Sequence, residues 1–188
     1  LYVRAFFFLM FLATVQDTVC GVLMPALRKA KSPEGREYGF TIANKYMGIF
    51  AALGGFLVLS YARPITQYYY GGGPWTDCKP MIQIFAVSFF LRTVTGWGWW
   101  VLPMVRGDNR IIMWANVAYA VGLLTYGQLL IGLYGGVGGA WANLVTVVLL
   151  VPIFRCRTIH KEFGSLRSLL VVWPAVVAGF VMWAVSQF

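Results

Sequence analysis

The sequence predicts an all-α, polytopic transmembrane bundle of about six helices, and three observations support this fold class. Six apolar runs each approach the ~20 residues with which an α-helix crosses a hydrocarbon core of ~30 Å. Charged residues make up 11% of the chain and hydrophobic residues 60%, whereas charged residues average roughly 25% in soluble domains. Basic residues concentrate in alternate loops between the runs. We therefore expect residues 1–188 to form one transmembrane unit without a soluble domain.

The six predicted spans follow one another with only short loops between them. They are Ala5–Leu27, Phe40–Ala62, Met81–Val105, Ile111–Tyr134, Val137–Phe154 and Leu169–Gln187. Ser32, Pro33 and Gly35 are helix-breaking residues that end the first helix. The glycines of Gly135–Gly139 predict a tight turn between the fourth and fifth helices, and Pro174 is expected to kink the sixth.

The basic residues predict how these helices are oriented. Ten of them fall in loops that share one side if the spans alternate: Arg28, Lys29, Lys31, Arg36, Arg106, Arg110, Arg155, Arg157, Lys161 and Arg167. The opposite side has Arg4, Arg63 and Lys79. By the positive-inside rule, the loops 28–39, 105–110 and 155–168 are assigned to the cytoplasm. A nucleic-acid-binding patch would not follow loop parity, so the net charge of +9 does not indicate a nucleic-acid partner.

This topology places both ends of the chain outside. Because the sequence opens on Leu1 rather than a methionine, we expect it to be part of a longer protein. Asp108 and Glu162 fall in the basic loops and are expected to be solvated.

Two charged residues are predicted to lie deep in the membrane. Asp17 and Arg92 are each about a dozen residues from the outer end of an inward-running helix, which at ~1.5 Å per residue puts both ~18 Å deep. Each such charge costs at least ~2.5–3.5 kcal/mol to insert, so neither is expected to face lipid. They either form a structural ion pair between the first and third helices or line a water-filled cavity that meets an ionic substrate or coupling ion. The sequence leaves both interpretations open.

Lys45 and Trp99 are weaker candidates for the same cavity. Lys45 is only about five residues from the cytoplasmic end of the second helix, so its side chain either reaches the headgroups or lines the cavity. Trp99 continues the helical stripe of Arg92 and either belongs to an interfacial aromatic belt or stacks on a sugar ring.

No pattern in the sequence indicates catalysis, a metal or a cofactor. There is no nucleophile elbow and no acidic cluster. Cys20, Cys78, Cys156 and His160 are too scattered for a zinc site, which needs about four converging ligands. We therefore do not expect an enzyme.

Several motifs occur in a characteristic order along nearly the whole chain. The first span ends in Met24–Arg28 (MPALR), and an outer segment Gly72–Trp75 (GGPW) leads to the apolar Ile82–Ala86 (IQIFA). An inner turn Gly107–Arg110 (GDNR) and the motif Tyr134–Ala142 (YGGVGGAWA) follow. In these motifs the chain resembles the carboxy-terminal lobe of the oligosaccharide (O-antigen type) flippases of the multidrug, oligosaccharidyl-lipid and polysaccharide exporter superfamily.

The resemblance implies a fold of two pseudosymmetric lobes around a central cavity, this chain being the carboxy-terminal lobe and packing against an amino-terminal lobe. It implies a multi-pass protein of the inner (plasma) membrane that moves lipid-linked oligosaccharide, of the polyprenyl-pyrophosphate type, to the outer leaflet for surface polysaccharide assembly. In that role Arg92 would contact the anionic pyrophosphate, Lys45 would assist near the cytoplasmic mouth and Asp17 would position Arg92. Trp99 would stack on a sugar. Beside the substrate and the other lobe, the partners are membrane lipids.

Three other functions are left open. A cation-coupled multidrug exporter of the same superfamily would place carboxylates in the cavity, for which Asp17 is the candidate. A membrane-embedded glycosyl or acyl transferase would need a catalytic acid, base or metal site. In a purely structural membrane subunit, Arg92 would only hold two helices together.

Overall fold

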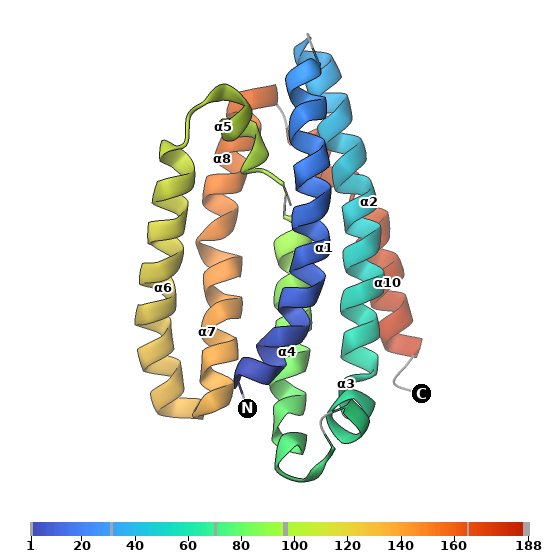
Figure 1. The fold of residues 1–188 in the computed structure, drawn as a ribbon, viewed down its shortest axis with the longest axis vertical. Helices are drawn as coiled ribbons and strands as arrows, with labels where there is room; N and C mark the ends of the chain where they lie inside the picture. The colour runs from blue at the N-terminus through green and yellow to red at the C-terminus, as the bar shows by residue number, and fades with distance from the viewer. Residues whose placement is uncertain (1, 31, 70, 96–97, 165, 186–188) are drawn as a thin grey trace.

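The computed structural model describes residues 2–30, 32–69, 71–95, 98–164 and 166–185, and every regular element within these ranges is helical. The elements in chain order are α1 (Tyr2–Lys29), α2 (Pro33–Ser60), α3 (Ala62–Pro64), the π-helix η1 (Ile65–Tyr69), the 3₁₀-helix η2 (Gly73–Cys78), α4 (Lys79–Val94), α5 (Val101–Arg106), α6 (Arg110–Tyr134), α7 (Gly136–Leu149), α8 (Val151–Phe163), α9 (Arg167–Leu170) and α10 (Trp173–Val185) (Figure 1). The predicted all-α class is therefore confirmed.

Four helical segments among the described residues are long and apolar enough to cross a membrane. They are Met10–Lys29, Pro33–Ser60, Arg110–Tyr134 and Gly136–Phe163. The last of them combines α7 and α8 into one span, and these four segments correspond to the first, second, fourth and fifth predicted spans. The third and sixth are built differently.

The third predicted span, Met81–Val105, is not one continuous helix. Helix α4 ends at Val94, and α5 begins only at Val101. Gly98, inside this break, has a φ of +75°, a left-handed conformation that a right-handed helix does not contain and that glycine adopts readily. Hydropathy alone predicted one helix because the break is short and carries no charged residue between two apolar helices.

The fifth and sixth spans also differ from their predicted bounds. The fifth was expected to end at Phe154, but the helix continues through α8 to Phe163. Arg155 therefore lies within a helix and is buried, so the prediction that it belongs to a cytoplasmic loop is wrong. In the sixth span, α10 has 13 residues with Pro174 in its first turn, where proline starts a helix rather than kinking it. The predicted end of this span, Gln187, lies outside the described residues.

The helices are arranged so that the basic loops meet at one end. The connection between α1 and α2, the short α5 and the end of α8 lie at one end of the bundle, whereas α3 and the α6–α7 turn lie at the other (Figure 1). This is the arrangement that loop parity predicts. We call the first of these ends the basic end. Helix α6 packs along α7, while α1, α2 and α7 pack on α4, and α10 packs on α2.

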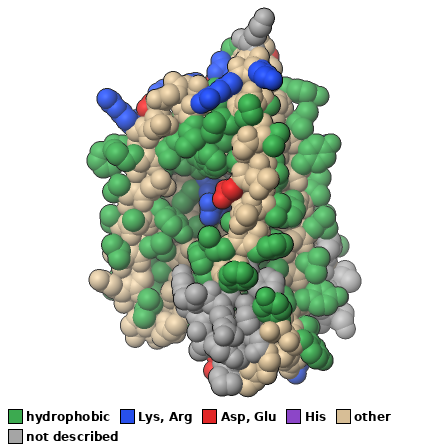
Figure 2. Space-filling view, viewed as in Figure 1, with side chains coloured by type: hydrophobic (Ala, Val, Ile, Leu, Met, Phe, Trp, Pro, Cys, Tyr) green, Lys and Arg blue, Asp and Glu red, His purple; other side chains and the backbone are tan. Residues whose placement is uncertain are grey.

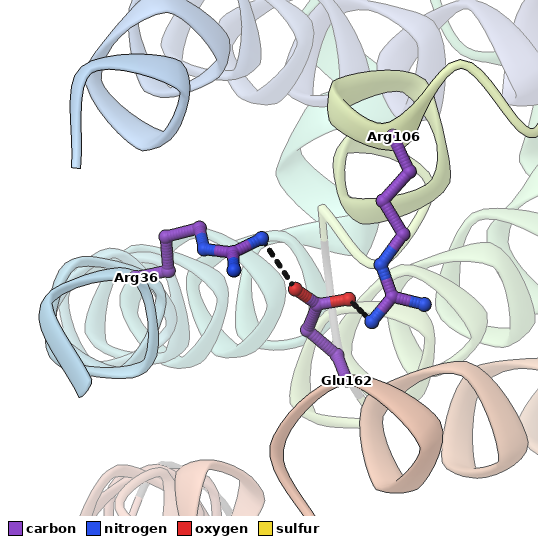
Figure 3. A network of polar contacts seen from close by, with 3 residues as sticks. All are labelled: Arg36, Arg106 and Glu162. Atoms are coloured by element: carbon purple, nitrogen blue, oxygen red, sulfur yellow. Dashed lines mark hydrogen bonds and ion pairs between the residues drawn. The ribbon is translucent and has the colours of Figure 1, made fainter. Parts of the chain in front are cut away.

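Glu162 fastens three elements together at the basic end. Its Oε1 accepts a hydrogen bond from Arg36 Nη1 of α2 at 2.9 Å, and its Oε2 pairs with Arg106 Nη2 of α5 (Figure 3). The Glu162 side chain is only 4% exposed, so the prediction that it is solvated is wrong. The reason is that α8 is longer than predicted and carries Glu162 back against α2 and α5.

Close packing at the turn between α6 and α7 explains one glycine of the Tyr134–Ala142 motif. A Cβ at Gly138 would overlap the backbone carbonyl of Leu130 on α6. The backbones of the two helices approach this closely only because residue 138 has no side chain. The motif therefore fixes the geometry of the α6–α7 hairpin.

We expect Glu162→Gln to destabilise the fold by about 1–3 kcal/mol, because the two charge-assisted contacts of the buried carboxylate are lost. The cost stays in this range because Arg36 and Arg106 are 26% and 37% exposed and can turn toward water. The measurement is the thermal unfolding midpoint of the purified protein. Asp77→Asn, at an exposed carboxylate near the opposite end, is the matched control. Equal midpoints for the two variants would contradict this role of Glu162.

Gly138→Ala should destabilise the α6–α7 hairpin by about 1–3 kcal/mol, since the added methyl group forces the two backbones apart. Gly132→Ala is the matched control, because a Cβ there would meet open space. Unfolding midpoints of the two variants test the difference. A Gly138→Ala protein as stable as the Gly132→Ala protein would show that the close approach is not needed.

Candidate functional site

A cavity with a volume of about 410 Å³ opens between α1, the end of α4 and the three helices α6, α7 and α8. Its lining combines charged, polar and aromatic side chains: Asp17, Arg92, Trp99, Trp100, Ile112, Ala115, Asn116, Tyr119, Val147, Val151 and Arg155. Acidic and basic side chains are visible at a hollow about halfway between the two ends of the molecule (Figure 2). The cavity therefore lies about midway along the bundle, where the sequence predicted Asp17 and Arg92.

Three of the four residues predicted for the site line this cavity. Asp17 from the middle of α1 and Arg92 from the last turn of α4 are both exposed on its surface, and Trp99 comes from the break after α4. Lys45 lies elsewhere, exposed on α2. Its predicted assisting role at the cytoplasmic mouth stays a prediction.

Asp17 and Arg92 share the cavity without pairing directly. Neither Asp17 nor Arg92 takes part in an ion pair with another residue that the structure describes. Both charged groups are thus available to a ligand or to water. This geometry favours cavity lining over a structural ion pair between the two helices.

A hydrogen bond next to these charges sets their position. Gln16 Nε2 of α1 donates to Thr93 Oγ1 of α4 at 2.5 Å, and Thr93 Oγ1 donates in turn to the carbonyl of Phe89 at 2.8 Å. Gln16 and Thr93 are both 2% exposed. Because Asp17 and Arg92 directly adjoin these residues in sequence, the bond fixes the register at which α1 and α4 present their charges to the cavity.

Arg155 is the charged residue of the cavity lining that the sequence did not predict. Its side chain lines the cavity, although the residue as a whole is only 3% exposed. Its Nη1 donates to the backbone carbonyl of Arg92 and to Thr95 Oγ1, the latter at 2.6 Å. Its Nε has no hydrogen-bond partner among the residues that the structure describes.

A weak sequence signal for the burial of Arg155 did exist. Thr158 and Ile159, three and four residues further along α8, are buried with it. This spacing is that of one face of a helix. The predicted loop 155–168 therefore contains a helical pattern in its first residues. The high density of basic residues concealed it.

Helix α6 contributes two polar side chains, Asn116 and Tyr119, to the cavity lining. Tyr119 lines the cavity, and its hydroxyl oxygen accepts a hydrogen bond from Asn143 Nδ2 of α7 at 2.8 Å. Asn116, one turn before Tyr119, is exposed at the cavity. The hydrogen bond joins α6 to α7 and holds the Tyr119 ring at the wall.

The charges of the cavity suit an anionic ligand. The two guanidinium groups of Arg92 and Arg155 face a single carboxylate, that of Asp17. Guanidinium groups bind phosphate and carboxylate oxygens through paired hydrogen bonds. Trp99, Trp100 and Tyr119 add ring faces and edges against which a sugar can pack.

Comparisons with protein-family models, with curated proteins and with solved structures found no match to this chain.

Proposed function

We propose that this chain is the carboxy-terminal lobe of a flippase that moves lipid-linked oligosaccharide, of the polyprenyl-pyrophosphate type, across the cytoplasmic membrane for surface polysaccharide assembly. The observation that carries the proposal is a cavity, midway between the ends of the bundle, that both Arg92 and Arg155 line. The motif resemblance to oligosaccharide flippases supports it independently.

The pyrophosphate headgroup explains why two arginines are placed at this depth. Each charged side chain costs at least ~2.5–3.5 kcal/mol to insert at the centre of a membrane. A pyrophosphate that leaves water loses its hydration, and guanidinium donors replace part of it with charge-assisted hydrogen bonds. The lipid tail stays in the bilayer while the headgroup and sugars cross through the polar cavity.

An amino-terminal lobe is proposed to cover the cavity from the outside. Asp17 and Arg92 are exposed on this chain, and acyl chains cannot hydrate or hydrogen-bond charged groups. A second helical lobe would enclose these side chains in a water-filled passage. This is the two-lobed arrangement that the resemblance implies.

The aromatic side chains suggest where the sugars pass. Trp99 is 7% exposed and packs largely in the core, whereas Trp100 is half-buried and lines the same cavity. We propose that the two tryptophans together form the sugar-contacting wall, with Trp100 the more accessible ring. Lys45, on α2, would attract the headgroup nearer the cytoplasmic end.

One observation favours a second candidate, a cation-coupled multidrug exporter of the same superfamily. Asp17 is an exposed carboxylate at the cavity and forms no ion pair among the described residues, as a site that binds a coupling cation requires. The two functions differ in their dependence on the charges. Asp17→Asn would abolish drug resistance in an exporter, whereas Arg92→Gln would abolish surface glycan in a flippase.

Arg92→Gln should reduce export of surface polysaccharide at least about tenfold while leaving the protein inserted in the membrane. Loss of a buried charge-assisted contact costs 2 kcal/mol or more, and each ~1.4 kcal/mol is a factor of ten. Export is measured as surface glycan in cells that carry the variant in place of the natural protein, and insertion by immunoblot of the membrane fraction.

Arg110→Gln is the matched control for this substitution. Arg110 is exposed at the basic end, at the start of α6, and its replacement should leave export unchanged. Normal export by the Arg92→Gln protein would remove Arg92 from the mechanism and with it the proposed function.

A further inference from the structure

The break between α4 and α5 is held by a side chain from a distant part of the sequence. Arg155 of α8 donates from Nη1 to the carbonyl of Arg92, in the last turn of α4, and to Thr95 Oγ1, directly after it. Thr95 Oγ1 itself donates to the carbonyl of Leu91 at 2.8 Å. A chain of hydrogen bonds thus runs from α8 into the final turn of α4.

The depth of the break makes these contacts necessary. The last carbonyls of a helix have no amide partners within that helix, and in the middle of a membrane there is little water to replace them. If α4 continued as a helix, the carbonyl of Arg92 would bond to the amide of residue 96. Arg155 supplies a donor to this carbonyl from α8.

The same contacts govern the side chain of Arg92. Its guanidinium is directed by the backbone of the α4 terminus, which Arg155 holds through the carbonyl of Arg92 itself. We propose that Arg155 is a positioning residue, which clamps the end of α4, maintains the break and thereby presents Arg92 to the cavity. The consequence for transport rests on the role proposed for Arg92, whereas the clamp itself does not.

A cysteine beside the break can report on the clamp. Cys20 of α1 is 0% exposed, and a Cβ added to Gly98 in the break would lie 3.8 Å from its Sγ. The break therefore covers this thiol. Movement of the break would expose Cys20 to the cavity, and the thiol would then react with a small reagent.

The experiment measures the rate at which N-ethylmaleimide labels Cys20. The purified protein carries Cys78→Ala and Cys156→Ser, so that Cys20 is the one thiol left in residues 1–188, and is reconstituted in lipid nanodiscs. Arg155→Met removes the donors but keeps an unbranched side chain, and should raise the labelling rate at least about tenfold. Arg155→Lys keeps a charged donor and should restore most of the protection.

Arg157→Met is the matched control, because Arg157 is exposed two residues further along α8 and should leave the rate unchanged. If Arg155→Met does not fold, Thr95→Val decides the question, since it removes one acceptor of the clamp while keeping a side chain of similar shape. It should give an intermediate rate.

Two results would overturn the inference. The first is a Cys20 that stays as unreactive in a folded Arg155→Met protein, or in Thr95→Val, as in the parent. The second is normal polysaccharide export by an Arg155→Met protein whose Cys20 has become reactive, because Arg92 would then work without the clamp. The first result does not involve export, and the second counts against the inference only where Arg92→Gln abolishes export, so failure of the clamp and failure of the proposed function are distinguishable.

Discussion

The structure depends on one constraint, which is that polar groups placed midway through the membrane must find partners within the protein. The broken helix α4–α5 creates such groups at the end of α4, where Arg155 donates to the carbonyl of Arg92 and Thr95 to that of Leu91. Gln16 of α1 and Thr93 of α4 are two further polar side chains in this region, and they satisfy the same constraint by a hydrogen bond to each other. The charged cavity is therefore surrounded by hydrogen bonds that each join separate helices.

The two ends of the bundle are built to hold this interior in place. At the basic end, Glu162 joins α2, α5 and α8, which fixes α5, the helix after the break, to α8, the helix that carries Arg155. At the opposite end, Gly138 lets α6 and α7 meet backbone to backbone, and Asn143 joins the same two helices at Tyr119. These contacts connect the helices that form the break, the clamp and the cavity wall.

Much of this arrangement could be predicted from the sequence. Asp17 and Arg92 were placed at one depth because helical rise converts residue number directly into distance, and they do line one cavity. Hydropathy did not reveal the break, because the break is short and uncharged, and the left-handed Gly98 has no hydropathic signature. Arg155 and Glu162 were misplaced for a related reason: a basic run marks the end of a span in the positive-inside rule, yet α8 continues through it and buries both residues.

The central claim is that the cavity recognises an anionic lipid headgroup, and ligand binding tests it most directly. The protein in nanodiscs is titrated with a polyprenyl pyrophosphate and, separately, with the polyprenyl alcohol of equal chain length. Two guanidinium groups in a site of low dielectric should bind the pyrophosphate at least about tenfold more tightly, and added salt should reduce the difference. Equal affinity for the two lipids, or a difference that salt leaves unchanged, would contradict the account.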